Sequence, residues 1–150
     1  MKYFIYTVIV IVGIAIVAGF FMIGSPGQER ARRFDAQRVQ DLQTIQWQIG
    51  DFYHAKNRLP QTLSELNDSF RGIIIPKDPE NGNDYEYHVK VPTSFTLCTT
   101  FNLPSVQENI NSLPKAVPDT FFVGDQTWNH GAELTCFDRT IDKDFFKPLK

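Results

Sequence analysis

The feature that most limits how this chain can fold is a long uncharged stretch near its start. Residues 3–23 read YFIYTVIVIVGIAIVAGFFMI. About 20 apolar residues suffice for a helix to cross the ~30 Å hydrocarbon core of a bilayer, so we predict a single transmembrane anchor over residues 1–24. A cleaved signal peptide is the alternative, but its apolar region usually spans only ~7–15 residues, and no clean site of small residues follows here.

The remaining residues, 25–150, have the length of one modest globular head, and two signals disagree about the side of the membrane on which it lies. Lys2 alone precedes the span, so the arginines that follow it favour a cytoplasmic head. Those arginines are Arg30, Arg32, Arg33 and Arg38. Cys98 and Cys136 favour the opposite side, because a disulfide needs an oxidising compartment, although two cytosolic thiols are also compatible with the sequence. We expect a single-pass membrane protein with an extracytoplasmic head.

Charge argues against one class of partner. Of the 15 basic and 17 acidic residues, only Lys2 precedes the span, so the remainder of the chain is mildly acidic. A nucleic-acid partner is therefore not expected, because no broad basic surface can form. Membrane lipid is the partner that the anchor implies.

The residues after the anchor have the period of an amphipathic helix, which we place at 28–56 and call the stalk helix. Its apolar side chains fall within about 100° of one another. They are Ala31, Phe34, Leu42, Ile45, Ile49, Phe52 and Tyr53.

Trp47 lies on the opposite side of the stalk helix. It is either an aromatic residue that is exposed or partly covered, or a contact to a partner subunit. Arg30, Arg32 and Arg33 are candidate contacts to a partner or to lipid headgroups, or simply charges at the membrane boundary.

Alternating residues after the helix predict a small antiparallel sheet, so the expected fold class is α+β. A capping box of Thr62 and Glu65 indicates a short second helix. Strands are expected at 85–91, 95–101 and about 133–141, and an irregular loop is expected at 103–127.

The alternation of the second and third strands also predicts a disulfide. If their large apolar side chains face the stalk helix, Cys98 and Cys136 share the opposite face of the sheet. We therefore expect these two cysteines to form a structural disulfide.

The stretch KDPENGNDYEY, residues 77–87, is either a structural turn or a calcium loop. Asp78, Glu80 and Asp84 could offer oxygen ligands, but their spacing fits an EF-hand poorly. Asp78, Pro79, Gly82 and Asp84 are residue types that turns favour, so a structural turn is the preferred interpretation.

The chemistry-bearing residues form no enzyme signature. His54, His88 and His130 are far apart, and the cysteines lack the close spacing of a zinc site. A local nucleophile motif such as G-x-S-x-G is also missing. We therefore expect a non-enzymatic protein without a cofactor or metal.

The order of these parts resembles type IV pilins and type II secretion pseudopilins. In that family a long helix is followed by a Leu-Pro or Tyr-Pro step, a short L-x-x-L helix and a DP-x-x-G-x-x-Y-x-Y segment. The corresponding positions are Leu59-Pro60, Leu63 to Leu66, and Asp78-Pro79 through Gly82 to Tyr85 and Tyr87, within a likeness that covers about residues 28–101.

The resemblance implies a long N-terminal helix packed on a small antiparallel sheet. It also implies a structural or accessory subunit of a cell-envelope pilus or secretion-type assembly, with other pilin-like subunits as partners. MKYFIYTVIVIVG holds no recognisable prepilin cleavage motif, so processing and polymerisation stay open. The alternative function is a membrane-tethered module that binds a ligand or protein through the loop 103–127 and belongs to no filament.

Overall fold

The computed structural model describes residues 2–23, 26–105 and 121–143. Residues 106–120 of the expected loop 103–127 thus lie outside the described residues. The chain divides into two compact units, residues 1–33 and residues 34–150.

The first unit consists of helix α1 (Lys2–Ile23) and the beginning of helix α2 (Pro26–Lys56). Every side chain from residue 3 to residue 16 of α1 is exposed. Pro26 suits the first position of α2, because the N–H that proline lacks would have no partner inside the helix. Among the described residues, no helix has the combination of length and apolar character that crossing a membrane requires.

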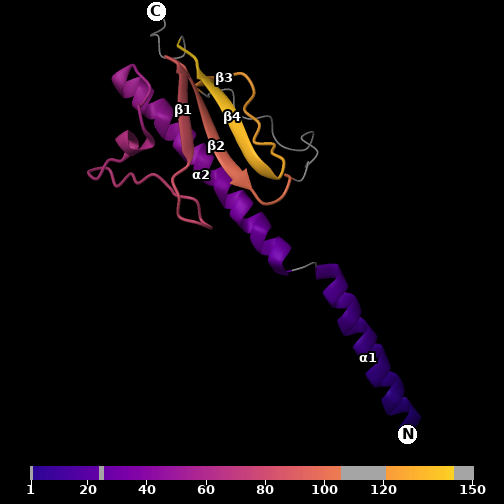
Figure 1. Cartoon of the computed structure of the whole chain (residues 1–150). Coiled ribbons are helices and arrows are strands. Elements are labelled where there is room, and N and C mark those ends of the chain that lie inside the picture. The colour runs from indigo at the N-terminus through magenta and orange to yellow at the C-terminus, as the bar shows by residue number, and fades with distance from the viewer. Residues whose placement is uncertain (1, 24–25, 106–120, 144–150) are drawn as a thin grey trace, which may run out of the picture. The chain divides into compact units, whose positions relative to one another are not determined.

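In the second unit, the part of α2 from Phe34 onward lies along one face of a four-stranded antiparallel sheet (Figure 1). The helix buries an apolar stripe that includes Leu42, Ile45, Ile49 and Tyr53. These side chains pack in one core cluster with residues of the strands and of the segment 59–66. The helix ends where Asn57 takes a positive φ of 54° and donates its N–H to the carbonyl of Tyr53, as helix C-termini commonly do.

The sheet has the strand order β1-β2-β4-β3, and all its neighbouring strands are antiparallel. Its strands are β1 (Glu86–Val91), β2 (Ser94–Phe101), β3 (Phe122–Val123) and β4 (Glu133–Ile141). Phe95, Leu97 and Phe101 of β2 are buried, as are Phe137 and Ile141 of β4. The predicted α+β class is therefore confirmed, and β3 is an addition that the sequence did not predict as a strand.

The predicted disulfide is confirmed. Cys98 of β2 and Cys136 of β4 are direct partners in the antiparallel register, with Cα atoms 4.1 Å apart, and their sulfur atoms are bonded. The face opposite the helix thus holds the covalent link, as the alternation of apolar residues predicts.

The expected short helix is present as a single 3-10 turn, Leu63–Leu66. Two expectations about local detail were wrong. The hydroxyl of Thr62 contacts that of Ser64 instead of capping the backbone. Glu65 nevertheless accepts the N–H of Gln61. In β1, Val89 and Val91 remain about half exposed, although their alternation with polar residues predicts a buried face.

Candidate functional site

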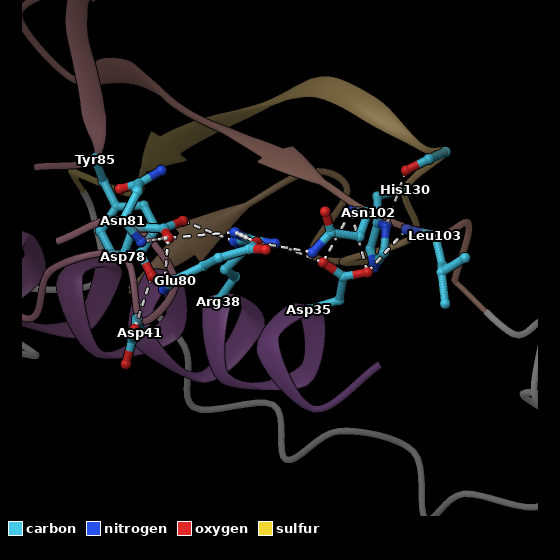
Figure 2. Close-up of polar contacts among 11 residues, drawn as sticks. Asp35, Arg38, Asp41, Asp78, Glu80, Asn81, Tyr85, Asn102, Leu103 and His130 are labelled. Atoms are coloured by element: carbon cyan, nitrogen blue, oxygen red, sulfur yellow. Dashed lines mark hydrogen bonds and ion pairs between the residues drawn. The ribbon is translucent and has the colours of Figure 1, made fainter. Parts of the chain in front are cut away.

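Arg38 of α2 is the centre of the most extensive polar cluster among the described residues (Figure 2). Its guanidinium donates to Asp78 at 2.7 and 3.2 Å, to Asp35 at 2.8 Å and to Glu80 at 2.7 Å. The side chain is 3% exposed. One arginine therefore ties the helix to the turn before β1. We call Asp35, Arg38, Asp78 and Glu80 the Arg38 cluster.

The cluster extends to the end of β2. Asp35 accepts the backbone N–H groups of Asn102 and Leu103, and the side-chain amide of Asn102 donates to Glu80 (Figure 2). Three segments far apart in the sequence are thus held by one set of charge-assisted hydrogen bonds, which are stronger than neutral ones.

The environment shifts the pKa values of these groups. Burial alone would raise the pKa of Asp78, but hydrogen bonds from Arg38 and from the N–H groups of Glu80 and Asn81 outweigh it and hold the pKa below its usual value. Hydrogen bonds from Asn102 and then Arg38 lower the pKa of Glu80. Burial would lower the pKa of Arg38, yet its carboxylate partners raise it above the ordinary value. Arg38, Asp78 and Glu80 are therefore charged near neutral pH.

The turn that the sequence singled out forms around Asp78. Its Oδ1 accepts the N–H groups of Glu80 and Asn81, and its carbonyl accepts the N–H of Gly82, which has a positive φ of 72°. Asp84 forms an exposed ion pair with Lys77 at 3.0 Å. Arg38 is the cation that Asp78 and Glu80 bind in this geometry, so the turn has a structural explanation without a calcium ion.

Two tyrosines after the turn are anchored by their hydroxyls. Tyr85 donates to Asp41 of α2 at 2.7 Å, and Tyr87 donates to the carbonyl of Pro60 at 2.9 Å. Burial, together with Asp41, raises the pKa of Tyr85, so its hydroxyl stays protonated and keeps donating. The stretch KDPENGNDYEY thus places Tyr85 directly before β1 and Tyr87 at its second position.

A second buried arginine, Arg139 of β4, binds neutral acceptors. It donates from Nε to the Oε1 of Gln46 at 2.8 Å and from its other nitrogens to the carbonyls of Asp125 and Thr127. Its guanidinium also lies 4.3 Å from the ring centroid of Trp128. This arginine holds the segment 125–128 against β4 and α2.

The candidate contact residues lie in two different places. Trp47 is 47% exposed, and its ring meets that of Phe121 edge-on, with centroids 5.2 Å apart. Arg32 and Arg33 are exposed near the start of α2, and Arg33 pairs with Glu29 at 3.4 Å. Arg30 also takes part in an interaction. Trp47 and the arginines belong to different compact units of the chain.

The histidines lie on separate elements, α2, β1 and the segment before β4. The ring of His130 stacks on that of Phe101, with ring centroids 3.5 Å apart. Within the part of the chain that the structure describes, no group of histidine, cysteine, aspartate and glutamate residues is arranged to hold a metal ion.

The sequence did not predict that polar residues of α2 would be buried next to the core. Asp35, Arg38, Asp41 and Gln46 are buried on α2, although their residue types usually lie at the surface. A signal was present, because Arg38 lies four positions after Phe34 and four before Leu42, on the apolar side of the helix. A charged residue at such a position indicates a buried partner.

Comparison with known protein families, with curated proteins and with solved structures finds no significant match.

Proposed function

We propose that this chain is a single-pass, membrane-anchored, pilin-like protein that serves as a non-enzymatic structural or accessory subunit of a cell-envelope assembly. The observation that carries the proposal is the surface of α1. Fourteen consecutive positions, residues 3–16, are exposed, uncharged and mostly apolar. A helix that is apolar on all sides needs an apolar environment, and lipid supplies one.

The architecture of the head supports the pilin-like part of the proposal. A long helix packs on a small antiparallel sheet, and the turn anchored by Arg38 lies at the position of the family-like DP-x-x-G segment. The disulfide supports an extracytoplasmic head, because such bonds persist in oxidising compartments. Arg30, Arg32, Arg33 and Trp47 are the proposed contacts to lipid headgroups or to neighbouring subunits.

Crosslinking in the native membrane tests the proposal. Cells that express the tagged full-length chain are treated with a membrane-permeable crosslinker, and the purified adducts are identified by mass spectrometry. We expect adducts with other pilin-like subunits and fewer of them for Trp47→Ala. We expect unchanged numbers for His54→Ala, which removes an exposed ring on the same helix, outside the hollow between α2 and the segment 65–73. A chain that is recovered only as a monomer would contradict membership of an assembly.

A membrane-tethered binding module is the second candidate function. The observation that favours it is a surface hollow of about 360 Å³ between α2 and the segment 65–73. A hollow of this size is within the range of ligand sites. A monomer that binds a ligand would support this function over the first.

A further inference from the structure

Strand β1 lies at one edge of the sheet and is uncovered on its outer side (Figure 1). Five of its six residues are exposed, and Tyr87 is partly buried. In the part of the chain that the structure describes, no turn or loop forms a backbone hydrogen bond with residues 86–91. An edge strand of this kind presents unpaired N–H and C=O groups to which a further strand can bind.

The register shows which backbone groups of β1 point to this free edge. Cys98 and Cys136 have Cα atoms 4.1 Å apart, a distance typical of an antiparallel pair that exchanges no backbone hydrogen bonds. The backbone groups of Cys98 therefore point to β1, where its partner is Glu86. Because the direction alternates along a strand, Tyr87 and Val89 direct their N–H and C=O groups to the free edge.

The charged side chains of β1 are placed symmetrically about His88. Glu86 lies two positions before it and Lys90 two positions after it, so all three belong to one face of the strand. Lys90 donates to Asp138 at 2.7 Å. Its ammonium is about half exposed and has further donors, so it can also bind a carboxylate of a second chain. This order of charges is complementary to an antiparallel copy of the same strand.

We propose that β1 pairs antiparallel with β1 of a second copy of this chain, with the two His88 residues opposite each other at a twofold axis. Glu86 of each copy then lies opposite Lys90 of the other, and opposite charges at such positions are stabilising. Tyr87 of each copy lies opposite Val89 of the other. These are the residues whose backbone groups point to the free edge, so the same register satisfies both the charges and the backbone.

The pairing also accounts for the exposure of Val89. This side chain is 46% exposed, although its partner on β2, Phe95, is buried in the core. Tyr87 packs against the core and is held by the hydrogen bond from its hydroxyl to the carbonyl of Pro60. In the paired strands each Tyr87 ring lies beside Val89 of the other copy, and aromatic residues paired with β-branched ones stabilise sheets.

Charges and bulges often protect an edge strand from pairing, and β1 has both. Its register shifts between Val89 and Val91, which lies beyond the residues that form the new backbone bonds. The charges repel a strand that presents like charges, but they attract an antiparallel copy of β1. The charge order therefore favours a second copy of this chain over an unrelated strand.

Exchange of charges between two chains tests this pairing. The full-length protein is purified in detergent micelles, and its dimerisation constant is measured by analytical ultracentrifugation. Glu86→Lys and Lys90→Glu each place like charges opposite each other, and we expect each to weaken dimerisation at least about tenfold. An equimolar mixture of the two variants restores opposite charges and should dimerise about as tightly as the unmodified protein. Asp51→Lys, an exposed charge reversal on α2, is the control and should leave dimerisation unchanged.

A cysteine at the twofold axis tests the register. In His88→Cys the two introduced thiols lie opposite each other, with Cβ atoms about 4.5–5.5 Å apart. We expect mild oxidation to join two chains through them, which a non-reducing gel detects. Thr100→Cys is the control, because this exposed residue lies on β2, away from the free edge. It should yield far less of the joined product.

A protein that stays monomeric at millimolar concentration would overturn the proposal. Dimerisation that is insensitive to Glu86→Lys would do the same, because another surface would then join the two copies. Equal crosslinking of His88→Cys and Thr100→Cys would contradict the register. None of these results bears on the proposed membrane assembly, because the assays use purified protein without sibling subunits.

Discussion

Arg38 shows how a single buried side chain can organise a head of this size. It binds three carboxylates, and together these residues connect α2, the turn before β1 and the end of β2. Burying charges is costly unless each one is paired and hydrogen-bonded. Removing one partner therefore leaves the other charges of the cluster incompletely paired and lowers the free energy of unfolding of the head.

Replacing Arg38 by methionine should lower the free energy of unfolding by about 3–5 kcal/mol, because the variant keeps most of the volume but leaves buried carboxylates without a counter-charge. Arg33→Met is the matched control on the same helix. Its exposed pair with Glu29 should contribute less than about 1 kcal/mol. Urea denaturation followed by circular dichroism measures both values, and equal effects of the two variants would contradict the role of Arg38.

Acid should weaken the Arg38 cluster. The pKa values of Asp78 and Glu80 are lowered in the folded state, so their contribution is present above the ordinary values of 3.8 and 4.5 and is lost as pH falls through the lowered values. We expect Asp78→Asn to destabilise the protein at pH 7 and to destabilise it less as the pH falls below the ordinary value of 3.8. Urea midpoints of both proteins across this range measure the change, and a difference that is independent of pH would contradict it.

The antiparallel neighbours β2 and β4 are the strands whose positions the sequence predicted best. Alternation over residues 95–101 and 133–141 predicted both strands and the face on which Cys98 and Cys136 meet. The alternation of residues could not predict that Val89 and Val91 would be exposed. Their exposure depends on which other segments of the chain cover the edge strand β1. The 3-10 turn at Leu63–Leu66 was likewise too short for its sequence pattern to separate it from an α-helix.

Replacing Cys98 and Cys136 together by alanine should lower the free energy of unfolding by about 2–5 kcal/mol, because the bond closes a loop with a sequence separation of 38 residues. Thr100→Ala with Leu134→Ala is the matched control. These residues are also cross-strand partners, two positions away, but share no covalent bond, so about 1 kcal/mol or less is expected. Thermal melts under non-reducing conditions compare the two pairs, and a similar loss in both would count against a stabilising disulfide.

For the whole molecule, the sequence predicted the α+β class and the order of its main parts. It did not predict the Arg38 cluster, which is the polar centre of the candidate site. The apolar stripe of α2 is visible as a period, but the partners of Arg38 are 40 and 42 positions away, in a turn whose residues also suit a surface loop. Such pairing depends on the tertiary fold. The same reason explains why Arg139 and Gln46, which are 93 positions apart, were not predicted as partners.

The proposed anchor makes a prediction at this scale. Ile9→Arg combined with Ile14→Arg should raise the apparent free energy of insertion by about 5–7 kcal/mol and release the protein from the membrane fraction after an alkaline wash. Both side chains are exposed on α1, so the head should keep its fold. Ile9→Leu with Ile14→Leu is the control and should remain in the membrane. Retention of the arginine variant at the control level would argue against a lipid-spanning helix.

Protease protection tests the proposed topology most directly. Spheroplasts that express the full-length chain with a C-terminal tag are treated with an externally added protease, next to a cytosolic reporter protein. We expect the tag and the head to be digested while the reporter stays intact, because the disulfide-linked head is proposed to lie outside the cytoplasm. A head that is protected as completely as the reporter would contradict an extracytoplasmic location.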